Sequence, residues 1–259
     1  MRRISGSVRP AALVTGASRG IGRSTALALA GAGYDVAVNY SSSVAAAEKV
    51  AGEVRGLGAR VLLCRADVAD EAAVLAIAGQ IREEFGRLDA LVNNAGITIK
   101  TPPADLDGLD MGDWDRVFAV NVRGLFQVTR ACVPLLRAAD NAAVVNLASI
   151  AGLRPGPQPF PYAASKAAVA NLTKTLAGRL GPDGIRVNAV APGWMTGEWM
   201  EEQLGENYDR LMERRAHLTP LRRCVTPDEV AATIVSLIIG NPFVTGEIIV
   251  IDGGFASTT

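Results

Sequence analysis

Histidine is nearly absent from this sequence, and cysteine is scarce. The only histidine in 259 residues is His217, so a metal site built from several histidines is excluded, and a histidine-based triad would have to use this one residue. The three cysteines, Cys64, Cys132 and Cys224, are far apart and form no CxxC pair. This spacing predicts buried or free thiols in a reducing compartment and argues against a disulfide framework or a zinc site.

The chain also lacks an excess of charge of either sign and any long apolar run. Its 26 basic and 26 acidic residues balance, so nothing draws it to nucleic acid or to an anionic membrane. No stretch reaches the roughly 20 apolar residues of a membrane span. The N-terminal MRRISGSVRP has no apolar core of the kind found in secretory signals. We therefore expect a cytoplasmic protein whose residues 1–10 form a flexible lead-in.

Short, apolar, β-branched runs do recur, and they alternate with helix-length segments. Strands of this kind are typical of a parallel sheet that helices bury on both faces. No linker or low-complexity segment interrupts the pattern, so residues 11–259 are expected to form one domain. We predict an α/β fold, a single-domain Rossmann fold with a doubly wound, seven-stranded parallel sheet. The expected strands are 11–16, 35–40, 60–68, 88–96, 142–149, 185–192 and 247–254.

Helices are expected between these strands, notably at 44–57, 113–137 and 162–180. Ser41 to Ser43 and Asp70 are suitable caps for the helices that follow them. Thr226, Pro227 and Glu229 match a capping box with proline at the first helical position, which predicts a further helix start.

A glycine-rich octet, TGASRGIG at 15–22, directly follows the first strand and opens the first helix. Its glycines allow a tight turn and close approach of a ligand, and the helix N-terminus offers free N–H groups to a pyrophosphate. A purely structural turn is the alternative, but the strand–loop–helix context is that of a dinucleotide site. The predicted cofactor contacts are Gly16, Ser18, Arg19, Gly20, Ile21 and Gly22.

The end of the second strand bears on which dinucleotide binds. An acidic residue there would bind the ribose hydroxyls of NAD and repel a 2′-phosphate. This chain has instead Asn39, Tyr40, Ser41 and Ser42, and Arg19 supplies a cation for that phosphate. We expect NADP(H), with NAD(H) as the alternative. The other interpretation is that Arg19 is solvated and the serines only cap a helix.

Tyr162 and Lys166 are four residues apart, which places both on one face of a helix. A tyrosine titrates near about 10, and a nearby positive charge favours the phenolate and lowers that pKa. Ser149, at the end of the apolar run AAVVNLAS, could hold a substrate oxygen against the same phenol. The three residues predict a proton-transfer site for an alcohol or a carbonyl.

Taken together, these residues resemble the short-chain dehydrogenase/reductase family in its main single-domain branch. The resemblance spans almost the whole chain and rests on the order of its motifs. These are TGASRGIG, Asp67-Val68, NNAG at 93–96, Asn121, Ser149, the Tyr162/Lys166 pair, Pro192-Gly193 and the terminal IDGG.

The resemblance implies a catalytic role for four residues. Tyr162 would be the general acid/base, Ser149 would orient the substrate oxygen, and Lys166 would lower the pKa of Tyr162 and bind the nicotinamide ribose. Asn121 would position a water that links Lys166 to solvent, although it could instead pin a bend in its helix. No metal is implied.

Further cofactor contacts follow from the same resemblance. Asp67 could instead be a strand-end cap. The implied contacts are Asp67 and Val68 at the adenine, Asn94, Ala95 and Gly96 along the cofactor, Pro192 and Gly193 beside the nicotinamide, and Thr196 at the carboxamide or a phosphate.

The nearest resemblance is to 3-oxoacyl-(acyl-carrier-protein) reductases, which reduce a small carbonyl substrate carried as a thioester. Sugar or other secondary-alcohol dehydrogenases of the family are the alternative, and a catalytically idle NADP-binding regulatory or scaffold protein is the alternative of another class. Enoyl reductases are disfavoured because their tyrosine and lysine are more than four residues apart. The resemblance also implies a homotetramer or a homodimer.

Three loops are expected to contact substrate, at 97–110, 150–161 and 194–219. The middle loop carries four prolines and departs from the loop common in relatives that act on carrier-protein thioesters. Residues 194–219 resemble the family's substrate lid, and an amphipathic helix packed permanently on the core is the alternative. Arg214, Arg215, Arg222 and Arg223 could meet an acidic carrier or form a solvated face.

Overall fold

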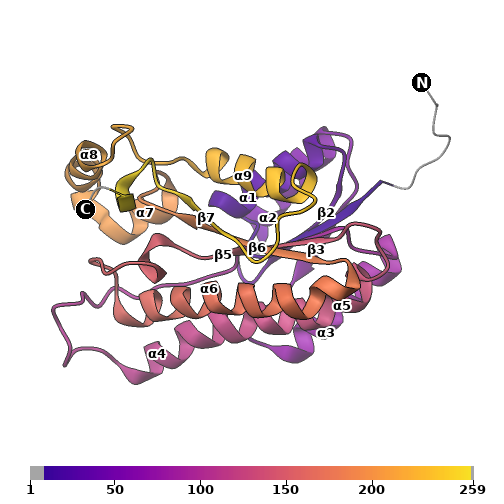
Figure 1. The fold of residues 1–259 in the computed structure, drawn as a ribbon, viewed down its shortest axis with the longest axis horizontal. Coiled ribbons are helices and arrows are strands. Elements are labelled where there is room, and N and C mark those ends of the chain that lie inside the picture. Colours follow the sequence, from indigo (N-terminus) through magenta and orange to yellow (C-terminus); the bar gives the residue numbers. More distant parts are fainter. Residues whose placement is uncertain (1–8, 258–259) are drawn as a thin grey trace.

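The computed structural model describes residues 9–257, so most of the predicted lead-in at 1–10 lies outside the described residues. Seven strands of this part of the chain form one sheet in the order β3-β2-β1-β4-β5-β6-β7, with parallel pairing throughout (Figure 1). The predicted fold class is confirmed. The strands are β1 (Ala11–Val14), β2 (Asp35–Tyr40), β3 (Val61–Arg65), β4 (Ala90–Asn93), β5 (Ala143–Leu147), β6 (Arg186–Pro192) and β7 (Ile248–Ile251).

Helices cover both faces of the sheet, as its nearly all-apolar strands require. The helices are α1 (Gly20–Gly31), α2 (Val44–Gly56), α3 (Glu71–Phe85), α4 (Met111–Phe118), α5 (Leu125–Leu136), α6 (Phe160–Leu180), α7 (Glu198–Leu204), α8 (Tyr208–Leu218) and α9 (Pro227–Ile239). In Figure 1, α1, α2 and α9 lie on one face and α3, α5 and α6 on the other, while α7 and α8 stand at one end of the sheet.

The core is divided by the sheet into two apolar clusters. One packs Leu29, Val50 and Ile234 of α1, α2 and α9 against the strands. The other packs side chains of α3, α5 and α6, among them Ile81 and Val169. Burial of each such side chain contributes about 1.5–3 kcal/mol, so the sheet is the rigid part on which the loops at its carboxyl edge are mounted.

A buried polar network crosses the second of these layers. Asn93 on β4 donates to Thr129 of α5 and to Asn146 of β5, both at 2.9 Å. Asn146 in turn donates to Thr173 of α6 at 3.0 Å. An unpaired buried amide would cost about 1–3 kcal/mol, so these bonds tie two helices to the centre of the sheet.

Two of the three helix caps predicted from the sequence are present in the structure. Asp70 caps α3 by accepting from Ala73 N, and Thr226 with Glu229 forms the complete capping box of α9. Ser43 occupies the N-cap position of α2 but its side chain makes no capping hydrogen bond.

The helix predicted at 113–137 is present, but it is not α-helical throughout. Between α4 and α5, residues Ala119–Gly124 form a π-helical segment that contains Asn121. Such segments often occur at functional sites. Among the described residues, no helix combines the length and apolar character needed to cross a membrane.

Candidate active site

One pocket opens at the carboxyl edge of the sheet, where β1 lies between β2 and β4 and the chain changes direction across the sheet. This switch point is where open α/β sheets bind ligands. The pocket brings together most of the predicted site residues from both halves of the chain: Gly16, Ser18, Arg19, Gly20, Ile21, Asn39, Tyr40, Ser41, Ser42, Asp67, Val68, Asn94, Ala95, Gly96, Ser149, Tyr162, Lys166, Pro192 and Gly193.

The glycine loop forms a cradle that only small residues permit. Gly16 and Gly20 have φ values of 60° and 54°, in the left-handed region that disfavours side chains. A Cβ on Gly22 would lie 2.4 Å from the carbonyl oxygen of Gly16, so Gly22 packs the loop against the helix and does not itself line the pocket. The N-terminus of α1 has no side-chain cap and no acidic residue in its first turn. Free N–H groups with a positive dipole end fit a pyrophosphate.

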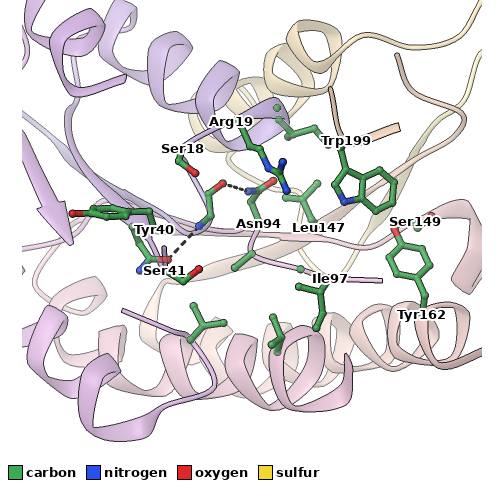
Figure 2. A pocket seen from close by; sticks show the side chains of 18 of the residues that line it. Ser18, Arg19, Tyr40, Ser41, Asn94, Ile97, Leu147, Ser149, Tyr162 and Trp199 are labelled. Carbon is green, nitrogen blue, oxygen red and sulfur yellow. Dashed lines mark hydrogen bonds between the residues drawn. The ribbon is translucent and has the colours of Figure 1, made fainter. Parts of the chain in front are cut away.

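Two asparagines hold this loop in place. The buried Asn39 side chain accepts from Gly16 N at 3.2 Å and donates to the carbonyls of Cys64 and Ala66, both at 3.0 Å. Asn94 donates to the carbonyls of Thr15 and Gly16 at 2.8 and 3.0 Å (Figure 2). Both the oxygen and the nitrogen of the Asn39 amide are already hydrogen-bonded within the protein, so this side chain positions the loop. The side chains that follow it in the chain remain available to contact a ligand.

At the far end of the pocket, Tyr40, Ser41, Ser42 and Ser43 lie near the glycine loop. Asp67 is the only carboxylate among the described residues that line the pocket. It accepts from Ala69 N at 2.9 Å and is ion-paired at 2.7 Å with Arg116 of α4. Its side chain is thus a strand-end cap as well as part of the pocket wall. Sequence reasoning missed Arg116, because its partner Asp67 is 49 residues away in the chain.

Tyr162 and Lys166 of α6 face the pocket together with Ser149, which follows β5. The Ser149 hydroxyl accepts from Ala151 N at 3.2 Å, and it adjoins the Tyr162 hydroxyl in Figure 2. The Lys166 ammonium lies 5.6 Å from the centre of the Tyr162 ring and donates to Leu147 O at 2.6 Å. The four-residue step therefore places both groups as predicted.

Burial is the main cause of the pKa shifts of Tyr162 and Lys166. It raises the pKa of Tyr162, and the neighbouring Ser149 hydroxyl opposes this only in part. Burial lowers the pKa of Lys166 to about 8. The expectation that the lysine charge would lower the tyrosine pKa is therefore wrong for the net direction. A raised pKa keeps Tyr162 protonated at neutral pH, which suits a group that donates a proton to a carbonyl.

Asn121 does not line the pocket. Its amide accepts from Ile97 N at 2.8 Å and donates to Ile97 O at 2.9 Å and to Ser165 at 3.0 Å. The side chain thus pins the π-helical segment to the loop after β4 and to α6, as the alternative interpretation held. A Cβ on Gly96 would lie 3.4 Å from Asn121 Oδ1 and 3.6 Å from Lys166 Nζ, so Asn121 does lie beside Lys166.

Thr196 is not among the residues that line the pocket. Its hydroxyl donates to Val225 O at 3.5 Å. Of the three expected substrate loops, 97–110 contributes Ile97, and 194–219 contributes Met195, Trp199 and Met200. No residue of the proline-rich loop lines the pocket, and its prolines 155 and 157 are exposed.

Residues 194–219 fold into α7 and α8 around a small apolar cluster of Met200, Met212 and Cys224, separate from the main core. Trp199 of α7 lies beside Tyr162, with ring centres 6.2 Å apart (Figure 2). Helical spacing could have identified this apolar face but not its contact with the tyrosine.

Three of the four arginines near α8 have partners within the protein. Arg215 lies over Trp194 at 3.6 Å, Arg222 donates to His217 O at 2.6 Å, and Arg223 is ion-paired with Glu229. All three cysteines are buried and free, and burial raises the pKa of Cys64 and Cys132 to about 12, too high for a nucleophile. The described residues contain no cluster of His, Cys, Asp and Glu suited to a metal ion.

A family model described as enoyl-(acyl carrier protein) reductase matches residues 16–256. The 3-oxoacyl-(acyl-carrier-protein) reductase FabG of Staphylococcus aureus is 40% identical over 244 residues, covering 94% of this chain and 96% of the relative. The chain belongs to the short-chain dehydrogenase/reductase family. Among solved structures of the family, levodione reductase has a TM-score of 0.90 at 32% identity, covering 96% of this chain and 98% of that one. An NAD⁺-bound xylitol dehydrogenase has a TM-score of 0.88 at 32% identity, covering 96% and 100%.

Membership of the short-chain dehydrogenase/reductase family gives the class of chemistry. The protein is an oxidoreductase of the NAD(P)(H)-dependent kind that acts on a carbonyl or a CH–OH group. The resemblance drawn from the sequence motifs is thereby confirmed.

Proposed function

We propose that the protein reduces a ketone, carried as a 3-oxoacyl thioester or a similar compound, to a secondary alcohol with NADPH. The observation that carries this proposal is the single pocket that joins the glycine loop to Ser149, Tyr162 and Lys166. The similarity to the 3-oxoacyl-(acyl-carrier-protein) reductase supports the substrate class. The four-residue step between Tyr162 and Lys166 disfavours enoyl reduction, despite the description of the matching family model.

The residues of the pocket divide the reaction between them. When bound, the nicotinamide supplies the hydride. Tyr162 Oη gives its proton to the substrate oxygen, which the Ser149 hydroxyl orients through a hydrogen bond. The Lys166 ammonium, 5.6 Å from the tyrosine ring, stabilises the phenolate that remains. Asn121 fixes the turn beside Lys166 through its bonds to Ile97 and Ser165.

NADP(H) is the proposed cofactor. Three serines, Ser41 to Ser43, and Arg19 line the same pocket, and the only lining carboxylate among the described residues, Asp67, is ion-paired with Arg116. The similarity to an NAD⁺-bound xylitol dehydrogenase makes NAD(H)-dependent oxidation of a sugar alcohol the second candidate.

Replacing Tyr162 by phenylalanine tests the mechanism. Tyr162→Phe should lower kcat for NADPH-dependent ketone reduction by at least about 100-fold, because general acid catalysis supplies this factor or more. The dissociation constant for NADPH should stay within about threefold, because a phenyl ring fills the same space. Tyr34→Phe, a phenol outside the pocket, is the matched control. Turnover within about tenfold of the parent would contradict the assignment.

The substrate is tested with the parent protein and a panel of 3-oxoacyl thioesters, simple ketones and sugar alcohols, followed by NADPH or NADH absorbance. Turnover of thioesters with NADPH supports the proposal, and turnover of sugar alcohols with NAD⁺ supports the second candidate. Tight NADPH binding without turnover of any compound would favour a regulatory protein.

We further propose a cytoplasmic homotetramer, or a homodimer as its half. Phe118, Val122, Phe126 and Leu172 form the apolar part of a surface hollow on α4 to α6 that Asp115, Arg116 and Arg123 also line, and Phe126 is 41% exposed. A second copy would cover this apolar face. Sedimentation velocity should show two or four chains, and a monomer at micromolar concentration would contradict this assembly.

A further inference from the structure

The helix α7 contacts the pocket at two places, Tyr162 and the glycine loop. Trp199 lies 6.2 Å from the Tyr162 ring, and Glu202 forms an ion pair of 2.5 Å with Arg19 of the glycine loop. Residues three apart share one face of a helix, so a single surface of α7 meets the proton donor and the cation. In Figure 2, Arg19 extends from the glycine loop toward Trp199.

This ion pair occupies Arg19, the cation proposed above to bind the 2′-phosphate of NADP(H). The side chains of Arg19 and Glu202 are 47% and 53% exposed, and half-exposed ion pairs contribute little to stability. A phosphate monoester carries a charge between about −1.5 and −2 at pH 7 and three acceptor oxygens. It would therefore displace a single carboxylate from the arginine.

The α7 segment is flanked by glycines whose backbone permits hinge rotation. It is bounded by Gly197 and Gly205, whose φ values are 112° and 51°. Backbone in this region is accessible to glycine and absorbs hinge rotation. Its buried side chain, Met200, packs in the small cluster with Met212 and Cys224, apart from both main core clusters. The α7 segment therefore packs chiefly on α8 and its neighbours, and not on the main core.

We propose that Glu202 competes with the 2′-phosphate of the cofactor for Arg19, so that a 2′-phosphorylated dinucleotide releases α7 and moves Trp199 away from Tyr162. A dinucleotide without this phosphate leaves the ion pair and the tryptophan in place. Glu202 therefore determines cofactor selectivity and couples it to access of substrate to the tyrosine. The inference rests on the NADP(H) preference proposed above.

Binding measurements on charge variants test the competition. Glu202→Gln should tighten the NADPH dissociation constant by about two- to fivefold, the ratio that corresponds to a half-exposed ion pair, and should leave the NADH value unchanged. Glu201→Gln is the matched control, because it removes the same charge one residue away and Glu201 makes no ion pair among the described residues. Calorimetric titration of the three proteins gives these constants without turnover.

A fragment experiment tests the release of α7. Adenosine 2′,5′-bisphosphate differs from AMP by the 2′-phosphate alone, so only the bisphosphate should shift the tryptophan emission of the parent. The shift should vanish in Trp199→Phe. Glu202→Gln should show the shifted emission without any ligand and respond no further.

Three results would overturn all or part of the inference, and they are distinguishable. If the parent prefers NADPH but Glu202→Gln binds it no more tightly than Glu201→Gln, the competition is refuted and the proposed cofactor stands. If the parent binds NADH as tightly as NADPH, the proposed preference and the inference fall together. Equal emission shifts with AMP and the bisphosphate would refute the release of α7.

Discussion

Gly152 controls how closely Ser149 approaches Tyr162 without contacting substrate. It ends the short 3₁₀ turn Ile150–Gly152, which begins at Ser149 and packs directly on the backbone of α6. A Cβ at this position would lie 2.4 Å from both Ala167 N and the carbonyl carbon of Lys166. Ordinary contact begins at 3.4 Å. Gly152→Ala must therefore push the turn and α6 apart by about 1 Å, and a misplacement of this size costs about 100-fold in rate.

The assay is steady-state ketone reduction together with calorimetric NADPH binding and thermal unfolding. We expect kcat to fall about 100-fold, NADPH affinity to change by less than about threefold because the glycine loop is remote, and unfolding to occur a few degrees lower because overpacking costs about 1–3 kcal/mol. Gly156→Ala is the control, since its Cβ would meet only the flexible end of Gln158. A Gly152→Ala enzyme with kcat within about threefold of the Gly156→Ala enzyme would refute the reasoning.

Two further predictions concern charge and stability. Reductase kcat should fall as pH rises through about 8, because Lys166, whose pKa burial lowers to about 8, is charged below that value and loses above it the charge that stabilises the phenolate; a rate that is flat from pH 7 to 9 would contradict this. Thr226→Ala removes the side-chain bond to Glu229 N at the start of α9. It should cost about 1 kcal/mol and lower the unfolding temperature by about 2–4 °C, with unchanged kcat, and an unaltered melting curve would show that the cap is redundant.

Much of the fold and the core of the site could be predicted because the signals are local. The apolar runs gave the seven strands, and the glycine octet gave the phosphate cradle. Tyr162 and Lys166 needed only the pitch of a helix. In each case neighbouring residues in the chain determine the geometry, and the structure places them in one pocket.

The features that the sequence did not reveal depend on distant contacts. The π-helical segment around Asn121 is held by Ile97 and Ser165, 24 and 44 residues away. The direction of the Tyr162 pKa follows from burial, which spacing does not reveal. Of the three loops expected to contact substrate, 194–219 supplies Met195, Trp199 and Met200 to the pocket lining, whereas the proline-rich loop supplies none. The place of these three side chains depends on how α7 packs, and sequence periodicity does not specify that packing.

The buried asparagines beneath the pocket have a consequence for strand alignment. Asn93 and Asn146 stand directly opposite each other on β4 and β5, among valines and leucines that would pair equally well in other alignments. A slip of one residue would turn every side chain to the other face and leave both amides without their partners. It would also move Ser149, which follows β5, by about 3.3 Å relative to Asn94 and the glycine loop. Two amides with no part in the chemistry thus specify the offset between the cofactor half of the site and the proton-transfer half.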